Sequence, residues 1–177
     1  YTINDEFYTF SYSKGLYKEI DNQLVVHDST LNSDYLFGLL ETSDDAIVFG
    51  RYFQGLSLQN KDSIRKAFSS KSNDYVLKNK LYNLLSYKVD EYLVGTIDGG
   101  AIHVSKDENI LSYFNKSTGI QDNVVNNIFV DNQDGVWLAL NNGISHIEAQ
   151  SPFTYWAYED GLHGIVTDVI RHNNKMY

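Results

Sequence analysis

The sequence contains no cysteine, which excludes disulfide bonds, catalysis by a thiolate and zinc sites built from cysteine. Proline occurs only once, at Pro152. Basic residues are also scarce, because 14 Lys and Arg stand against 23 Asp and Glu, for a formal net charge of −9. An acidic chain repels phosphate backbones, so nucleic acid is not expected as a partner. No apolar run approaches the ~18–20 residues that a membrane-spanning helix needs.

Motifs for nucleophilic catalysis, metal binding and phosphate binding are also missing. The sequence has no Gly-x-Ser-x-Gly, no His-Glu-x-x-His, no P-loop and no Gly-x-Gly-x-x-Gly. We therefore predict no catalytic residue, no metal site and no cofactor in this segment.

Aromatic and aliphatic residues are abundant. Of the 177 residues, 42% are hydrophobic, and there are 14 Tyr and 9 Phe. Such a composition is typical of a globular chain, and aromatic and β-branched residues favour strands. A helical period is not sustained anywhere, so we predict an all-β fold without helices.

Four hairpin glycines recur at nearly constant spacing. Their spacings are 40, 45 and 43 residues, and the glycines are Gly15, Gly55, Gly100 and Gly143. Four or five residues before each glycine comes a small residue, and these are Ser11, Gly50, Gly95 and Ala139. A period of ~40–50 residues with several short strands per unit is typical of a β-propeller of four-stranded antiparallel blades. The small residues are expected where inner strands of neighbouring blades converge.

The repeat divides the chain into approximate blades at residues 1–33, 34–73, 74–118 and 119–160, with the start of a further blade at 161–177. About four blades are therefore present. The uneven ends lead us to expect a fragment of a larger ring.

Three strands of this scheme are specific enough to test. We expect an outer strand of the second blade at 64–68, the first strand of the third at 75–85 and an outer strand of the fourth at 153–158.

The best-defined unit runs from Gly119 to Ile147. It carries Asp-Gly-Val-Trp at 134–137 and Asn-Asn-Gly-Ile-Ser at 141–145. This unit resembles the two-component regulator propeller repeat. The resemblance implies a ring of about seven blades in the periplasmic or otherwise extracytoplasmic sensor region of a bacterial hybrid histidine kinase. It also implies a signal peptide and further repeats upstream, and more repeats and a transmembrane helix downstream.

In that family the propeller typically recognises a glycan or another extracellular solute, and we expect no enzymatic activity in this segment. The expected partners are a small-molecule or oligosaccharide ligand and the remaining blades, and a second copy of the chain is a further candidate. Two alternatives stay open at this point. One is a propeller-type lyase or glycosidase, and the other is a protein-interaction scaffold.

Candidate ligand-binding residues occur in two places. Trp156 and Tyr158 share one face of the predicted outer strand of the fourth blade, since they are two residues apart. Arg51 and Tyr52 lie near a loop at the end of a predicted inner strand. Aromatic side chains can stack on sugar rings, but packing between blades would use the same residues.

Two patterns suggest metal binding, but neither provides the residues that a metal site needs. His103 and His146 occupy one repeat position, but Lys18 and Leu58 replace them in the other units. Asp131 and Asp134 suggest a calcium loop, yet no acidic residue closes it at the required distance. The Asp-box of other propellers fails as well, because Asp134 and Gly135 are adjacent. We expect an ordinary hairpin turn here.

Overall fold

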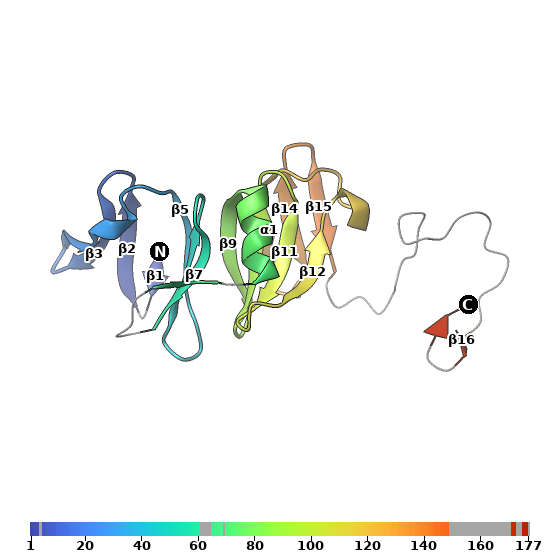
Figure 1. Ribbon diagram of the computed structural model, residues 1–177, viewed down its shortest axis with the longest axis horizontal. Coiled ribbons are helices and arrows are strands. Elements are labelled where there is room, and N and C mark those ends of the chain that lie inside the picture. The colour runs from blue at the N-terminus through green and yellow to red at the C-terminus, as the bar shows by residue number, and fades with distance from the viewer. Residues whose placement is uncertain (4, 61–64, 69, 149–170, 173–174, 177) are drawn as a thin grey trace.

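The computed structural model describes residues 1–3, 5–60, 65–68, 70–148, 171–172 and 175–176. Within them, antiparallel strands form three four-stranded sheets, one three-stranded sheet and a two-stranded hairpin. In Figure 1 the four larger sheets follow one another along the long axis of the molecule in chain order.

The sheets have the following strands. The first sheet contains β1 (Thr2–Ile3), β2 (Glu6–Ser11), β3 (Gly15–Ile20) and β4 (Gln23–Asp28). The second contains β5 (Leu36–Glu41), β6 (Ile47–Arg51), β7 (Gly55–Gln59) and β8 (Lys66–Ala67). The third contains β9 (Leu81–Lys88), β10 (Glu91–Thr96), β11 (Ala101–Ser105) and β12 (Ile110–Phe114). The fourth contains β13 (Val125–Val130), β14 (Val136–Leu140) and β15 (Ile144–Ile147), and the hairpin contains β16 (Arg171–His172) and β17 (Lys175–Met176).

The four predicted hairpin glycines all lie at the start of a strand or next to it, with positive φ. Their φ values are 102° at Gly15, 67° at Gly55, 86° at Gly100 and 90° at Gly143. At Gly100 a Cβ would also come within 2.1 Å of the Phe114 carbonyl oxygen. Because positive φ favours glycine, these positions mark the hairpins, as predicted.

The small residues before the hairpins were predicted to sit where strands crowd. Gly50 and Gly95 confirm this, since a Cβ on Gly50 would lie 3.0 Å from Leu84 and one on Gly95 would lie 2.9 Å from Val125 of the next sheet. The placement of Ser11 is wrong by one residue. Ser11 pairs with the turn glycine itself, and Phe10 occupies the position equivalent to Gly50.

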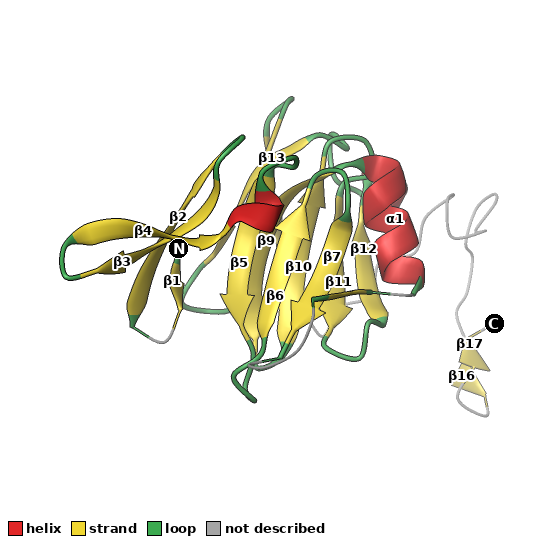
Figure 2. Cartoon of the chain, turned by 60° about the vertical axis from the view of Figure 1, so that its left-hand side comes forward, coloured by secondary structure: helices red, strands yellow, loops and turns green. Residues whose placement is uncertain are grey.

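The expectation of a chain without helices is wrong. Residues Lys71–Asn79 form a helix, α1, so the strand predicted at 75–85 begins only at Leu81. The helix contacts β7 of the second sheet and β10 of the third (Figure 2). Its buried residues are few, namely Ser72, Asn73 and Val76, which is why no helical period stands out in the sequence. Two short 3-10 helices lie at Ser29–Leu31 and Lys116–Thr118.

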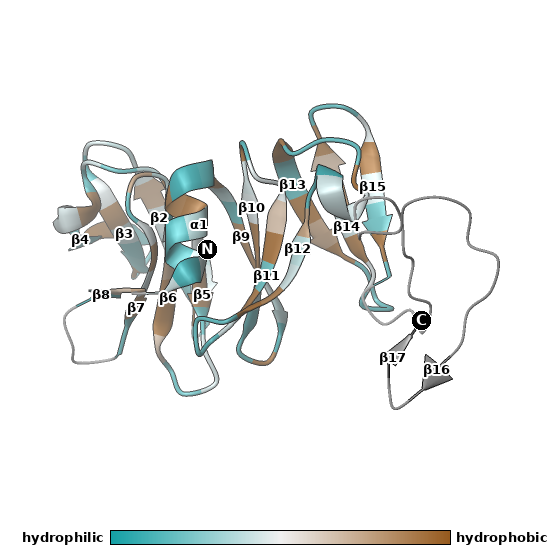
Figure 3. Cartoon of the chain, turned by 45° about the vertical axis from the view of Figure 1, so that its right-hand side comes forward, coloured by the Kyte–Doolittle hydropathy of each residue, from teal (hydrophilic) through white to brown (hydrophobic). Residues whose placement is uncertain are grey.

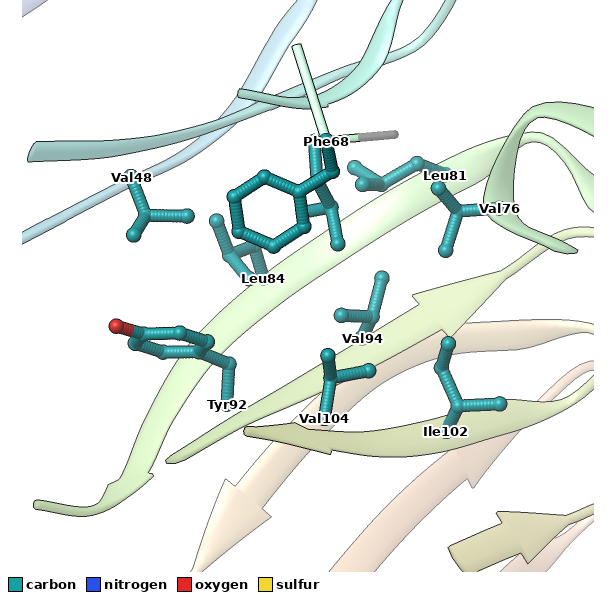
Figure 4. Close-up of a cluster of buried hydrophobic side chains, with 10 residues drawn as sticks. Val48, Phe68, Val76, Leu81, Leu84, Tyr92, Val94, Ile102 and Val104 are labelled. Carbon is teal, nitrogen blue, oxygen red and sulfur yellow. The ribbon is translucent and has the colours of Figure 1, made fainter. Parts of the chain in front are cut away.

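Hydrophobic side chains fill the spaces between neighbouring sheets, and Figure 3 shows that the strands carry most of the hydrophobic colouring. Between the second and third sheets, Val48, Phe68, Leu84 and Val94 belong to one buried cluster that also includes Val76 of α1 (Figure 4). A second cluster joins the third and fourth sheets, and a third joins the first two.

The two outermost faces of this row of sheets are apolar and exposed. Phe7, Leu24 and Val26 lie on the face of the first sheet opposite its buried residues. On the fourth sheet, Phe129, Trp137 and Ile144 likewise lie on the face opposite the buried residues of that sheet. These six side chains are 39–69% exposed, whereas the core residues are buried.

Of the predicted strands and units, some fall on residues outside the described ranges, and others can be compared with the structure. The strand at 153–158 and most of the unit at 161–177 belong to the first group. The strand expected at 64–68 is described only from residue 65, where β8 spans Lys66–Ala67. Among the described helices, none is long and apolar enough to cross a membrane.

Candidate binding surfaces

Six aromatic side chains from the first three sheets gather on one rim of the molecule. We call them the aromatic strip, and its members are Tyr12, Tyr35, Phe37, Tyr52, Phe53 and Tyr82. Tyr12 lies in the turn between β2 and β3, and Tyr52 and Phe53 lie in the turn between β6 and β7. Phe37 and Tyr82 belong to β5 and β9, the first strands of the second and third sheets.

The rings form a continuous series of contacts. Tyr12 and Tyr35 stack with centroids 4.5 Å apart and planes 14° apart. Phe37 and Tyr82 lie 4.6 Å apart, and Phe37 is 6.2 Å from Tyr35. These spacings fall within the ~4.5–7 Å at which aromatic rings attract one another.

A buried carboxylate holds the centre of the strip. Asp34 is 2% exposed, and its Oδ1 accepts hydrogen bonds from the backbone N–H groups of Tyr35 at 2.7 Å and Phe53 at 2.9 Å. The Tyr52 N–H donates to the Tyr35 carbonyl at 3.0 Å. Asp34 therefore ties the segment before β5 to the β6–β7 turn, which fixes three of the six rings relative to one another.

The strip is accessible despite these contacts. Tyr12 is 50% exposed, Tyr35 43%, Phe53 60% and Tyr82 37%. Exposed aromatic faces next to phenolic hydroxyl groups suit a ligand that offers both C–H surfaces and hydrogen-bonding groups, and a sugar ring is such a ligand.

Arg51, the neighbour of Tyr52, points the other way. It lines a cavity of about 830 Å³ between the first and second sheets, which we call the inter-sheet cavity. Its polar and charged lining residues include Glu6, Asp28 and Arg65, and its apolar ones include Leu39 and Phe49. The two neighbouring candidates, Arg51 and Tyr52, thus belong to two different surfaces.

The Arg51 side chain belongs to a residue that is only 7% exposed, yet it has few hydrogen-bond partners. Its Nη2 lies 3.5 Å from Ser57 Oγ, and its Nε has no hydrogen-bond partner among the described residues. Burial and the nearby Arg65 lower the pKa of Arg51, against the opposing effect of Asp34 and Asp28.

The second cation of the cavity is held more firmly. Arg65 forms an ion pair with Asp28 and lies over the ring of Phe49, with its Cζ 4.2 Å from the centroid. Burial alone would raise the pKa of Asp28, but hydrogen bonds from Thr30 and the charge of Arg65 together lower it. The Nε of Arg65, like that of Arg51, is buried without a described partner.

The turn at residues 131–135 is a hairpin connection closed by a carboxylate, as expected. Asp131 accepts hydrogen bonds from the backbone of Gln133 and Gly135 and, at 2.8 Å, from Trp137 Nε1. His146 stacks on Trp137 at 4.1 Å. These contacts lower the pKa of Asp131, the Trp137 hydrogen bond most of all.

The two histidines that share a repeat position have separate partners. His103 Nε2 lies 2.8 Å from Glu91, and His146 Nε2 lies 3.7 Å from Asp131. Across the described residues, no three His, Asp or Glu side chains gather as a metal site would require.

Trp156 and Tyr158 lie outside the described residues, so their role as candidates stays a prediction. Sequence reasoning missed most of the aromatic strip. One signal was available, because Tyr12 and Tyr52 both stand three residues before a hairpin glycine. Arg65 carried no such signal, since its partners are distant in sequence.

Solved structures with the same fold include extracellular proteins of bacteria. The extracellular domain of BT3049 from B. thetaiotaomicron, described as a hybrid two-component system, aligns with a TM-score of 0.65 at 17% identity, over 86% of this chain and 21% of that one. The extracellular domain of BT4673 from the same organism, described as a one-component system, aligns with a TM-score of 0.65 at 15% identity, over 98% and 27%.

A third structure is PorZ, a surface component of the type-IX secretion system of Porphyromonas gingivalis, with a TM-score of 0.51 at 14% identity over 73% of this chain and 19% of that one. The chain thus spans only a fifth to about a quarter of these proteins. At such identities the likeness establishes the fold. No protein-family model matches the sequence, and no curated protein matches it.

Proposed function

We propose that this chain is part of the extracytoplasmic sensing region of a bacterial two-component-type regulator, and that it binds its ligand without turning it over. The observation that carries the proposal is the shared fold with the extracellular domains of BT3049 and BT4673. The resemblance of residues 119–147 to the two-component regulator propeller repeat supports it independently, since that likeness rests on sequence alone.

The sheets would then be consecutive blades of a β-propeller, divided approximately at residues 33, 73, 118 and 160. The apolar outer faces of the first and fourth sheets support this arrangement. Phe7 and Leu24 at one end, and Phe129 and Ile144 at the other, are the kind of surface that packs against another sheet. A larger ring would supply the covering blades.

The ligand would be a glycan that lies on the aromatic strip. Tyr35 stands at its centre, stacked on Tyr12 and fixed by Asp34. A ligand held there would touch the first, second and third sheets together. It would therefore favour one arrangement of these sheets over others, which is how binding could shift a signalling equilibrium.

The test is a binding screen with neutral oligosaccharides, followed by titration of the Tyr35→Ala variant. Loss of one stacking ring at ~0.5–1.5 kcal/mol predicts an affinity roughly 2- to 12-fold lower. Tyr113→Ala is the matched control, because Tyr113 is also exposed but contacts Tyr75 away from the strip. Equal affinity in both variants would place the ligand elsewhere, and release of a hydrolysed or cleaved product would refute a purely sensory role.

A further inference from the structure

We propose that the inter-sheet cavity binds a small molecule through its carboxylate, and that Arg51 is the principal group that holds it. This inference rests on the proposed function only for the idea that the bound molecule is a signal. The binding itself stands on the geometry of the cavity.

The first observation is the isolation of Arg51. A guanidinium that is removed from water normally has a carboxylate or several carbonyl groups around it. Arg51 has one long contact with Ser57 and an unpartnered Nε, and it forms no ion pair with a described carboxylate. A buried arginine that lines a cavity and whose Nε has no described partner is suited to an anion from outside the chain.

The second observation is the arrangement of the other charges. Asp28 is paired with Arg65 and accepts two hydrogen bonds from Thr30, and Glu6 is paired with Lys18 at 2.6 Å. The remaining lining carboxylate, Asp45, is exposed in the turn between β5 and β6, at the other end of β6 from Arg51. Among the lining carboxylates, Asp28 and Glu6 are thus paired with cations, while the Nε of Arg51 has no described partner.

The third observation comes from the comparison of the repeats. By strand pairing, the positions equivalent to Arg51 are Ser11 in the first sheet, Thr96 in the third and Leu140 in the fourth. None of them is charged. Arg51 is therefore not required by the architecture, because the other sheets form without a cation at this position.

The size and lining indicate the class of ligand. A volume of about 830 Å³ lies within the ~300–1,000 Å³ typical of small-molecule sites. The lining combines apolar side chains, among them Leu16, Leu39 and Phe49, with polar ones such as His27 and Gln54. The guanidinium fork matches a planar carboxylate with two parallel hydrogen bonds, so a carboxylate on a compact polar skeleton, such as a sugar acid, fits best.

The inference is tested on the whole chain by NMR at constant ionic strength. The guanidinium N–H signals of Arg51 are assigned by their loss in Arg51→Lys, and then acetate, chloride, glucuronate and glucose are added in turn. We expect acetate and glucuronate to shift these signals, with chloride and neutral glucose without effect. An Arg51 signal that responds to neither carboxylate, or equally to chloride, would overturn the proposal.

Affinity for glucuronate is then compared among variants by calorimetry. Arg51→Gln is expected to weaken binding by tenfold or more, and Arg51→Lys by less, since it keeps the charge and loses the fork. Lys80→Gln is the control, because Lys80 is an exposed cation paired with Asp98 outside the cavity. Unchanged affinity in Arg51→Gln, or an equal loss in the control, would refute the assignment.

The outcome is separable from that of the proposed function. Glucuronate binding that depends on Arg51 supports the cavity as a site even if no transcriptional response follows in cells. Conversely, a glycan response that survives in Arg51→Gln supports sensing through the aromatic strip and removes the cavity from it.

Discussion

Replacement of Gly38 by alanine should destabilise the fold by wedging the second and third sheets apart. Gly38 and Gly50 are paired across β5 and β6, and both face Leu84 of β9. A Cβ on Gly38 would lie 2.3 Å from the Leu84 Cβ, about 1 Å short of the 3.4 Å at which ordinary contact begins. Because the obstructing atom is a Cβ, it can move only with the backbone of β9.

The expected cost follows from this geometry. Overpacking of a core costs ~1–3 kcal/mol, and a clash that must move a strand belongs at the upper end, about 3 kcal/mol. Alanine also reduces the entropy of the unfolded chain, which offsets roughly 0.4–1 kcal/mol. Gly50→Ala meets Leu84 at 3.0 Å, so a shift of a few tenths of an ångström suffices, and we expect a net loss of about 1 kcal/mol or less.

Urea unfolding of the two variants, followed by circular dichroism, measures the difference directly. For a chain of this size, the net loss of about 2–2.6 kcal/mol in Gly38→Ala should also lower Tm by roughly 4–10 °C. Equal free energies of unfolding for Gly38→Ala and Gly50→Ala would refute the close approach of β5 to β9, because the pair differs only in the room available for one methyl group.

Three further predictions concern single contacts. Asn73→Ala should cost about 2–4 kcal/mol in urea unfolding, because Asn73 satisfies the Leu56 N–H and the Phe68 carbonyl in a buried site. Tyr92→Phe should leave stability unchanged or raise it by about 1 kcal/mol in the same assay, since the buried hydroxyl has no described partner, and a clear loss would contradict this. Asp131→Asn should be less stable than the parent at pH 7. Because the native pKa of Asp131 is lowered, its contribution is present above about pH 4 and is lost as the pH falls through the native pKa, so thermal unfolding at pH 7 and pH 3 should show the difference shrink.

The hairpins could be predicted from the sequence because their causes are local. A glycine such as Gly100 indicates a backbone with positive φ. The spacing at which such glycines recur indicates the length of the repeating unit. The crowded positions Gly50 and Gly95 were found for a similar reason, since a small residue in an apolar strand needs a close neighbour. The prediction for Ser11 was wrong because a small side chain does not by itself determine the pairing register of a strand.

Helix α1 could not be predicted in this way, because it is stabilised by distant partners. Its Asn73 bonds to the backbone of β7, and Val76 lies in the cluster between the second and third sheets. A nine-residue helix with so few apolar residues is marginal by itself and depends on such contacts. The aromatic strip could not be predicted for a related reason, because its ring contacts join residues that come from three sheets and are distant in sequence.

The junction between the first and second sheets differs from the other junctions in one decisive respect. Where the second and third sheets carry Gly50 and Gly95, the first carries Phe10, which packs against the core cluster of the first two sheets. A benzyl group at this position prevents the close approach that glycine permits. The junction between the first and second sheets contains the inter-sheet cavity, and Arg51 and Arg65 line it. Phe10 and Arg51, which replace a small residue and an uncharged residue of the repeat, thus both lie at the junction that holds the cavity, so departures from the repeat are where ligand-binding residues are best sought.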